Sequence, residues 1–245
     1  MKISILTIAP ECFGDFLHLG VTGRAIQNGL AQIDIVDIRE FVRGSFRAVD
    51  DSPFGGGLGL VLRAKPVLDA LDHVVGDSPA LRVRTVLLSP SGTAHTQKRA
   101  HEFAERYEHL VLVCGHYEGI DARVLPFVDE QLSIGDYVLT GGELAAQVVA
   151  DSVIRLLPGA LREGSAGEES FENGLLEYPQ YTRPARLVLH GQEYQVPEVL
   201  LSGDHEKIRS WRRQESLRIT GERRPELLDL RDDGASDVLP RQPEF

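Results

Sequence analysis

The chain reads Cys114-Gly115-His116-Tyr117-Glu118-Gly119-Ile120-Asp121 and, eleven residues later, Ser133-Ile134-Gly135-Asp136-Tyr137-Val138-Leu139-Thr140-Gly141-Gly142-Glu143. Each stretch follows an apolar, strand-like run and is broken by glycines, which permit positive φ and close approach of the backbone to a ligand. Two such loops side by side form a backbone-lined cleft for a small polar cofactor. We expect the polar side chains between the glycines (Tyr117, Glu118, Asp121 and Asp136) to face chemistry or solvent. The pattern favours an enzyme over a structural protein.

The first 160 residues alternate between strand and helix patterns. Strands are predicted at 2–8, 32–38, 83–88 and 109–113, and helices at 23–29, 65–75, 96–107 and 143–157. We expect strand 83–88 to lead into a loop, Ser89-Pro90-Ser91-Gly92. We expect the helix at 143–157 to bury Leu144, Val148, Val149, Leu156 and Leu157. This alternation predicts an α/β fold with a mainly parallel sheet.

The periodicity ends after residue 160. Residues 160–184 have the polar, glycine-containing composition of a linker or mobile loop. Ser202-Gly203-Asp204 then signals the start of a helix. We therefore predict a catalytic domain over 1–160, a flexible linker over 161–184, and a small helical domain over 185–245 with a disordered tail from about Asp232.

Composition narrows the class of protein. The chain has 245 residues, of which 42% are hydrophobic, enough for one large domain or for one domain plus a small one. Neither a signal peptide nor an apolar run long enough to span a membrane is recognisable. The two cysteines, Cys12 and Cys114, cannot build a disulfide framework. A cytoplasmic protein with free thiols is expected.

The charge is distributed unevenly. Net charge is −11, which by itself argues against nucleic-acid binding. Residues 205–224 nevertheless carry seven Lys or Arg against three acids, whereas residues 225–245 carry six acids against two arginines. Within the basic segment, Arg209, Arg212 and Arg213 share one side of a predicted helix. They form either a solvated face or a contact for phosphates.

Other patterns keep two interpretations. The loop Asp50-Asp51-Ser52-Pro53-Phe54-Gly55-Gly56-Gly57-Leu58-Gly59 matches neither a P-loop nor a dinucleotide fingerprint. It is either a tight turn with solvated aspartates or a loop that closes on a planar base. Asp151 and Arg155 have the spacing of an ordinary helical pair. Cys114 and His116 lack matching partners, so we predict no metal site from residue spacing.

Taken together, these motifs resemble the bacterial tRNA (guanine-N1-)-methyltransferase family, a branch of the knotted SPOUT class. The resemblance spans residues 1 to about 228. Its other matching segments are Gly20-Val21-Thr22-Gly23-Arg24-Ala25, Val49-Asp50-Asp51 with Phe54-Gly55-Gly56-Gly57, Leu88-Ser89-Pro90, Tyr181-Thr182-Arg183-Pro184, and Val199-Leu200-Leu201-Ser202-Gly203-Asp204-His205.

The resemblance implies a parallel sheet with a deep trefoil knot in the catalytic domain, and S-adenosylmethionine bound in the knotted cleft. The residues that it assigns to the cofactor are Leu88, Ser89, Pro90, Gly115, Tyr117, Ser133, Ile134, Gly135, Tyr137, Leu139, Gly141 and Gly142. It also implies an obligate homodimer whose active sites are shared between subunits. The sequence neither requires nor excludes an assisting divalent ion such as Mg²⁺.

The implied reaction is methylation of N1 of the guanosine 3′ to the anticodon. Guanine N1 carries a proton at neutral pH, so a carboxylate must remove that proton and a cation must stabilise the charge that develops at O6. The resemblance places the base at Glu169, where the family has aspartate, and the cation at Arg155. Glu118 is a further polar group of the site, and Glu168 is the alternative base. His116 replaces the family's arginine, and Leu58 replaces its proline.

The resemblance also implies that the C-terminal domain holds the tRNA anticodon arm. The residues expected to contact RNA are Arg24, Asp50, Phe54, Gly55, Tyr181, Arg183, Ser202, Gly203, His205, Arg209, Arg212 and Arg213. Two rivals remain. One is a knotted methyltransferase with another RNA target, and the other is an RNA-binding protein that has kept the fold and lost turnover.

Overall fold

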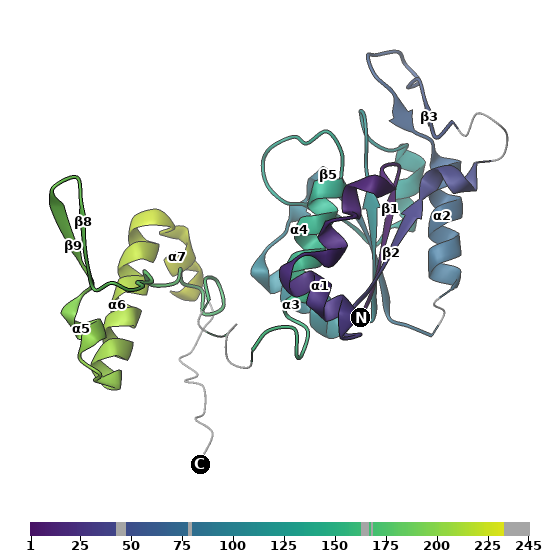
Figure 1. Ribbon diagram of the computed structural model, residues 1–245. Helices are drawn as coiled ribbons and strands as arrows, with labels where there is room; N and C mark the ends of the chain where they lie inside the picture. Colours follow the sequence, from purple (N-terminus) through teal and green to yellow (C-terminus); the bar gives the residue numbers. More distant parts are fainter. Residues whose placement is uncertain (43–47, 78–79, 163–166, 168, 233–245) are drawn as a thin grey trace. The chain divides into compact units, whose positions relative to one another are not determined.

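The computed structural model describes residues 1–42, 48–77, 80–162, 167 and 169–232 (Figure 1). The chain divides into two compact units, Met1–Glu163 and Gly164–Phe245. They are called the first and the second unit below. The first contains the alternating strands and helices, and the second contains residues of the expected linker and the C-terminal helices.

A five-stranded parallel sheet forms the centre of the first unit. Its strands are β1 (Lys2–Thr7), β2 (Gln32–Asp37), β5 (Val83–Ala94), β6 (His109–Cys114) and β7 (Glu130–Ser133), in the spatial order β2-β1-β6-β5-β7. Two short strands, β3 (Asp50–Asp51) and β4 (Val61–Leu62), pair separately and antiparallel. The predicted α/β class and the parallel sheet are therefore confirmed.

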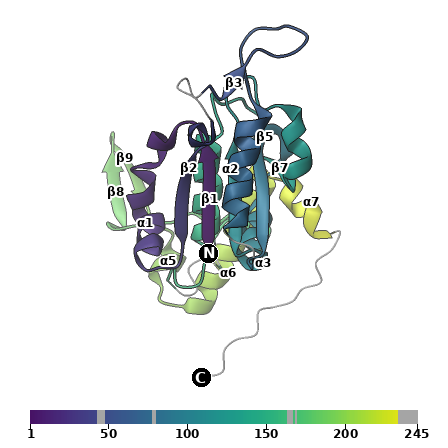
Figure 2. The ribbon, with the colours of Figure 1, turned by 90° about the vertical axis from the view of Figure 1, so that its right-hand side faces the viewer.

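Helices cover both faces of the sheet (Figures 1 and 2). On one face lie α1 (Gly20–Gln27), α3 (Gln97–Arg106) and α4 (Glu143–Ile154), and on the other lies α2 (Ala64–Gly76). Alternate strand residues serve the two faces: Ile3 and Ile5 pack on the α4 side, whereas Leu6 packs on the α2 side. Short 3-10 turns fill the connections, at Pro10–Phe13, Phe16–His18, Ile38–Phe41 and Ala122–Phe127.

The predicted elements of the first unit are present, with two differences. Strand β5 resumes after Leu88, because Leu88 and Thr93 both pair with Leu132 and the residues between them bulge out of the ladder. On α4, Val149 and Leu157 are buried as expected, but Leu144 and Val148 are 58% and 47% exposed. The expected burial of these two was wrong because α4 is apolar on nearly every side. Its alanines pack on the sheet instead.

The second unit combines helices with a hairpin that the sequence pattern did not predict. Strands β8 (Arg186–Leu189) and β9 (Gln192–Gln195) pair antiparallel. Helices α5 (Glu198–Leu201), α6 (His205–Arg223) and α7 (Glu226–Asp232) follow. Asp204 caps α6 as expected, since its carboxylate accepts from the Lys207 N–H at 3.1 Å. The tail expected to be disordered lies outside the described residues from 233 onward.

One buried histidine of the sheet ties stability to pH. His109 begins β6 with no exposed surface, and its Nε2 lies 2.9 Å from Ser4 Oγ. Burial, and secondly the charge of Lys2, lower the pKa of His109 to about 4. In the unfolded chain, His109 therefore binds a proton near pH 6.5, whereas in the folded chain it does so only near pH 4. Folding stability must fall as pH drops from about 6.5 toward 4.

Because of His109, we expect the free energy of unfolding to fall by roughly 2 kcal/mol when the pH is lowered from 7 to 5. Urea unfolding of the wild type and of His109→Gln across this range measures the effect. The variant should lose that part of the pH slope. The matched control is His73→Gln on the exposed side of α2, which should keep the wild-type slope. Equal slopes in the wild type and His109→Gln would show that His109 is not the group responsible.

Candidate cofactor pocket and catalytic residues

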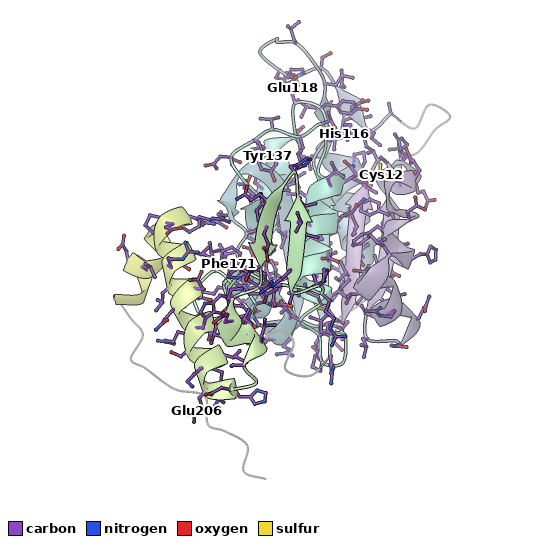
Figure 3. All side chains as sticks on the ribbon, turned by 60° about the vertical axis from the view of Figure 1, so that its left-hand side comes forward. Cys12, His116, Glu118, Tyr137, Phe171 and Glu206 are labelled. Atoms are coloured by element: carbon purple, nitrogen blue, oxygen red, sulfur yellow. The ribbon has the colours of Figure 1, made fainter. Side chains whose placement is uncertain are left out.

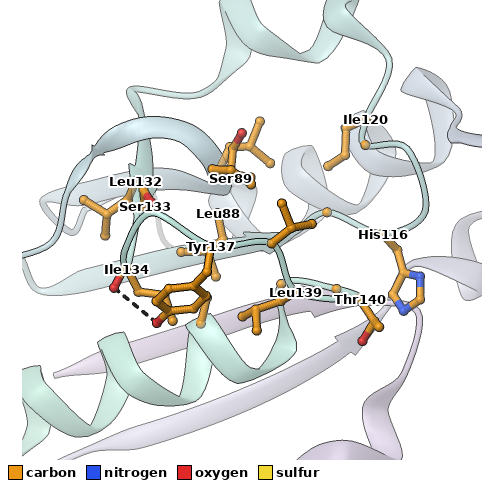
Figure 4. A pocket seen from close by; sticks show the side chains of 18 of the residues that line it. Leu88, Ser89, His116, Ile120, Leu132, Ser133, Ile134, Tyr137, Leu139 and Thr140 are labelled. Carbon is orange, nitrogen blue, oxygen red and sulfur yellow. Dashed lines mark hydrogen bonds between the residues drawn. The ribbon is translucent and has the colours of Figure 1, made fainter.

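A pocket with a volume of about 290 Å³ lies in the first unit, at the carboxyl ends of β6 and β7 and beside the bulge of β5 (Figure 4). Parallel α/β sheets bind ligands at this edge, since the loops that leave adjacent strands converge there. All twelve residues expected to contact the cofactor line the pocket. Other lining residues, Gly119, Ile120, Val138 and Thr140, belong to the two glycine loops that were expected to form the cleft. Sequence reasoning did not assign to it Leu87, Leu132 and Ala145, which also line it.

Main-chain contacts hold the two glycine loops together. The Gly142 N–H donates to the Gly115 carbonyl at 2.8 Å, and His116 and Gly141 form an antiparallel bridge. A Cβ on Gly142 would lie 2.8 Å from the Cα of Cys114, so this approach requires glycine. Within the second loop, the Tyr137 hydroxyl donates to the Ile134 carbonyl at 3.3 Å (Figure 4). Most of the wall is therefore backbone and apolar side chain, with few charged groups.

Among the lining residues, the titratable groups of the loop after β6 are His116, Tyr117 and Glu118. Figure 3 shows His116 and Glu118 at the same end of the first unit as Tyr137. Tyr117 has a φ of 59°, and its ring meets the His116 ring edge-on at 4.8 Å between centroids. Burial, then the charge of Asp50 and a hydrogen bond to it, raise the pKa of Tyr117. Asp50, which is expected to contact RNA, is therefore hydrogen-bonded to Tyr117, which is expected to contact the cofactor.

The glycine-rich loop reaches the rim of this pocket. The Glu118 N–H donates to the Leu60 carbonyl at 3.0 Å, and a Cβ on Gly59 would lie 2.6 Å from Glu118 Oε1. Four glycines of the loop have positive φ, as a tight turn requires. Phe54 is fully exposed. The loop is thus a tight turn, and it also stands beside the pocket.

Glu143 is a buried carboxylate that the sequence analysis did not single out. It is 7% exposed at the start of α4, and its Oε1 accepts from Thr7 Oγ1 at 2.7 Å. The positive end of the helix dipole favours a carboxylate there. Burial, and secondly the charge of Glu143, raise the pKa of the Cys114 thiol, so the reactive thiolate form is disfavoured. An acid directly after Gly-Gly at a helix start was the available signal for Glu143.

The expected catalytic pair falls in two different units. Arg155 caps the C-terminus of α4 in the first unit and is half-buried. Glu169 is half-buried in the second unit, where its carbonyl accepts from the Glu172 N–H at 3.3 Å. Glu168, the alternative base, lies outside the described residues. Asp151, the helical partner considered for Arg155, has a carboxylate that accepts from Thr22 Oγ1 at 3.0 Å.

The residues expected to contact RNA are mostly exposed. In the first unit, Arg24 is exposed on α1, and Phe54 and Gly55 lie in the glycine-rich loop. In the second unit, the exposed ones are Tyr181, Arg183, Ser202, Gly203, His205, Arg209 and Arg213. Arg212 is half-buried, with its guanidinium 4.6 Å from the ring centroid of Tyr178.

Part of the expected linker packs on α6. The Leu176 N–H donates to Thr220 Oγ1 at 2.9 Å, and the Arg224 guanidinium lies 5.8 Å from the ring centroid of Phe171. The segment around Phe171 to Tyr178 therefore belongs to the second unit.

Among the residues that the structure describes, no three His, Cys, Asp or Glu side chains come together as a group that could hold a metal ion. No described helix is both long and apolar enough to cross a membrane.

Comparison with known proteins decides the family. The family model described as tRNA (Guanine-1)-methyltransferase TrmD matches residues 1–230. The chain belongs to this family. Similar proteins named tRNA (guanine-N(1)-)-methyltransferase include that of Geobacillus kaustophilus, 49% identical over 94% of this chain and 92% of the relative. Those of Moorella thermoacetica and Heliobacterium modesticaldum are both 52% identical over 93% of this chain, and over 90% and 84% of their own lengths.

Proposed function

We propose that the chain is a tRNA methyltransferase that transfers a methyl group from S-adenosylmethionine to N1 of the guanosine 3′ to the anticodon. The observation that carries this proposal is the pocket at the sheet edge, lined by the loops whose sequence marks the family. Its size lies at the lower end of the range for small-molecule sites, and its glycines let the backbone approach a ligand closely. When bound, the cofactor supplies an electrophilic methyl group.

The other roles in the proposed reaction fall to residues of this chain. The Glu169 carboxylate accepts the N1 proton, so that the N1 lone pair becomes available for the new bond. The Arg155 guanidinium stabilises the negative charge that develops at O6. Gly115, Leu139 and Tyr137 hold the cofactor and keep water from its reactive end. The protein contributes mainly positioning and electrostatics.

A homodimer is part of this proposal. Leu144 and Val148 leave an apolar strip exposed on α4, and Val138, 85% exposed, lies at the pocket rim. Exposed apolar patches of this kind mark protein interfaces. A second copy that covers the strip would also bring its own residues to the pocket. We further infer the trefoil knot of the SPOUT class, which accords with the tight passage of Gly92 against β7, and a cytoplasmic location beside the tRNA substrate.

The test is methyl transfer from labelled S-adenosylmethionine to an anticodon-arm tRNA with guanosine 3′ to the anticodon. A tRNA with adenosine at that position is the control. We expect N1-methylguanosine, identified by nucleoside mass spectrometry, in the first tRNA alone. Methylation of another atom or RNA would favour the rival knotted enzyme. Cofactor and tRNA binding without product would identify an RNA-binding protein that has lost turnover.

Ion pairing separates the basic residues of the second unit into two sets. Arg218 pairs with Glu215 and Glu222 at 2.7 and 2.8 Å, and Lys207 pairs with Asp204 at 3.0 Å. In contrast, no described carboxylate pairs with Arg183, Arg209 or Arg213. Unpaired, exposed arginines can neutralise phosphates without first breaking an ion pair. We therefore assign RNA backbone contacts to this second set.

We expect Arg213→Ala to weaken tRNA binding roughly fivefold at physiological salt and to reduce the slope of log affinity against log salt by about 1. Arg218→Ala, on the same helix, is the matched control because its guanidinium is already paired within the chain. It should leave both affinity and slope near wild type. Filter binding across a salt series measures both quantities. Equal losses in the two variants would contradict the assignment of phosphate contacts by pairing.

A further inference from the structure

We propose that a second pocket, in the C-terminal unit, holds one unpaired nucleobase of the RNA. The proposal rests on the proposed function in one respect, namely that the ligand is RNA. This tyrosine pocket has a volume of about 320 Å³. One wall is the segment from Tyr178 to Arg183, and the other is formed by Leu200 and Leu201 of α5 with Ile208 and Arg212 of α6.

Both tyrosine rings of the pocket are held before any ligand binds. The Arg212 guanidinium lies 4.6 Å from the Tyr178 ring centroid, in the range of a cation–π contact. The Tyr181 ring packs against Trp211 with centroids 6.4 Å apart and a tilt of 52°. Tyr181 is still 47% exposed, so part of its ring remains available to a ligand. Rings fixed in this way lose little conformational entropy when a planar group stacks on them.

The charge of the lining also selects a ligand. The charged side chains that line the tyrosine pocket are Arg183 and Arg212, and none of the lining residues is acidic. Arg183 is exposed and has no acidic partner among the described residues. Arg209 and Arg213 lie three residues before and one after Arg212 on α6, on the same side of the helix. A cationic ligand is therefore disfavoured, and a group that carries phosphate is favoured.

A nucleobase satisfies these features together. Its flat face stacks on a tyrosine or on a guanidinium, its edge meets polar groups such as Gln180, and its phosphate lies within the field of the arginines. An aliphatic side chain of a protein partner would fit the apolar floor formed by Leu200 and Ile208. Such a partner would use neither the aromatic faces nor the positive charge of Arg183, Arg209 and Arg213. The combination favours an extruded base of single-stranded RNA.

The experiment uses the full-length protein and an anticodon-arm hairpin RNA, together with copies in which each loop position in turn is abasic. Trp211 is the single tryptophan of the chain and touches Tyr181, so its fluorescence reports on this pocket. In the wild type, loss of one loop base other than the target guanosine should weaken binding about tenfold. Tyr181→Leu, which keeps an apolar side chain, should weaken binding of the intact RNA about as much. When Tyr181→Leu binds the RNA that is abasic at the sensitive position, its affinity should be less than about twofold below its affinity for the intact RNA.

Tyr194→Leu is the matched control, since Tyr194 is 50% exposed on β9 and does not line the pocket. It should bind every RNA like the wild type. The proposal is wrong if Tyr181→Leu binds all the RNAs with wild-type affinity. It is also wrong if the free-energy loss from Tyr181→Leu adds in full to the loss from every abasic position. A shift in oligomeric state with Tyr181→Leu in sedimentation, without change in RNA affinity, would assign the pocket to a protein segment. Because the readout is binding, it stands whether or not methyl transfer is observed.

Discussion

Replacing Glu169 by glutamine should lower the rate of methyl transfer by about a hundred- to ten-thousand-fold, the usual contribution of a general base. The amide has nearly the same shape as the carboxylate, but it cannot accept the N1 proton of guanine. Affinities for cofactor and tRNA should stay within about twofold of wild type, since Glu169 acts on the reacting atom and not on the bulk of either ligand. Single-turnover assays with pre-bound tRNA separate chemistry from binding.

Two further variants make this result specific. Glu172→Gln changes a half-buried carboxylate three residues away in the same segment and should keep wild-type turnover. Glu169→Asp restores a carboxylate and should recover much of the rate, less any cost of placing it about one methylene short. Full turnover by Glu169→Gln would remove the assignment, and the same measurement on Glu168→Gln would then decide whether the neighbouring carboxylate is the base. Activity in both would exclude a general base at either position.

The location of the pocket could be predicted because it depends on local patterns. Each glycine loop follows an apolar strand, and parallel strands bring their carboxyl ends to one sheet edge. Of the lining residues, Gly115 follows the end of β6, Ser133 ends β7, and Leu88 stands where the predicted strand 83–88 ends and β5 bulges. Knowledge of the strands was therefore enough to bring them together. Arg155 and Glu169 could be selected only through the family resemblance.

Contacts between distant parts of the chain could not be read from pattern. The hydrogen bond between Thr7 and Glu143 joins residues 136 positions apart, so no local pattern could pair them. The face of α4 was misjudged at Leu144 and Val148, because a helix that is apolar on nearly every side has no polar stripe to mark the exposed one. Tertiary packing decides such cases.

The β8–β9 hairpin was missed for a different reason. Its strands are four residues long and exposed throughout, so they lack the alternation of a half-buried strand. The turn carried the usable signal. His190 and Gly191 both have positive φ, of 51° and 78°, as the favoured two-residue hairpin turn requires. The His190-Gly191 pair directly after the apolar run Leu187-Val188-Leu189 was the evidence available in the sequence.

Replacing Gly142 by alanine should weaken binding of S-adenosylmethionine at least about a hundredfold. The new Cβ would lie 2.8 Å from Cys114 Cα and 3.0 Å from the Gly115 nitrogen, both main-chain atoms at the end of β6. A buried strand cannot yield to this contact, so the loops must separate and the 2.8 Å bond from Gly142 N–H to the Gly115 carbonyl must lengthen. A displacement of about 1 Å in a tight site is enough for a loss of this size.

Gly76→Ala is the control for the substitution itself. A Cβ at this last residue of α2 meets no heavy atom within 4 Å, so the variant should bind cofactor normally and unfold at or slightly above the wild-type temperature. Calorimetric titration at a temperature where circular dichroism shows both variants folded measures the affinities. If Gly142→Ala does not fold, Tyr137→Ala replaces it, because that half-exposed pocket residue can be removed without opening the loops. Gly142→Ala forces the two loops apart, and Tyr137→Ala removes an aromatic side chain that lines the same pocket. Wild-type cofactor affinity in the folded variant would therefore mean that S-adenosylmethionine binds elsewhere.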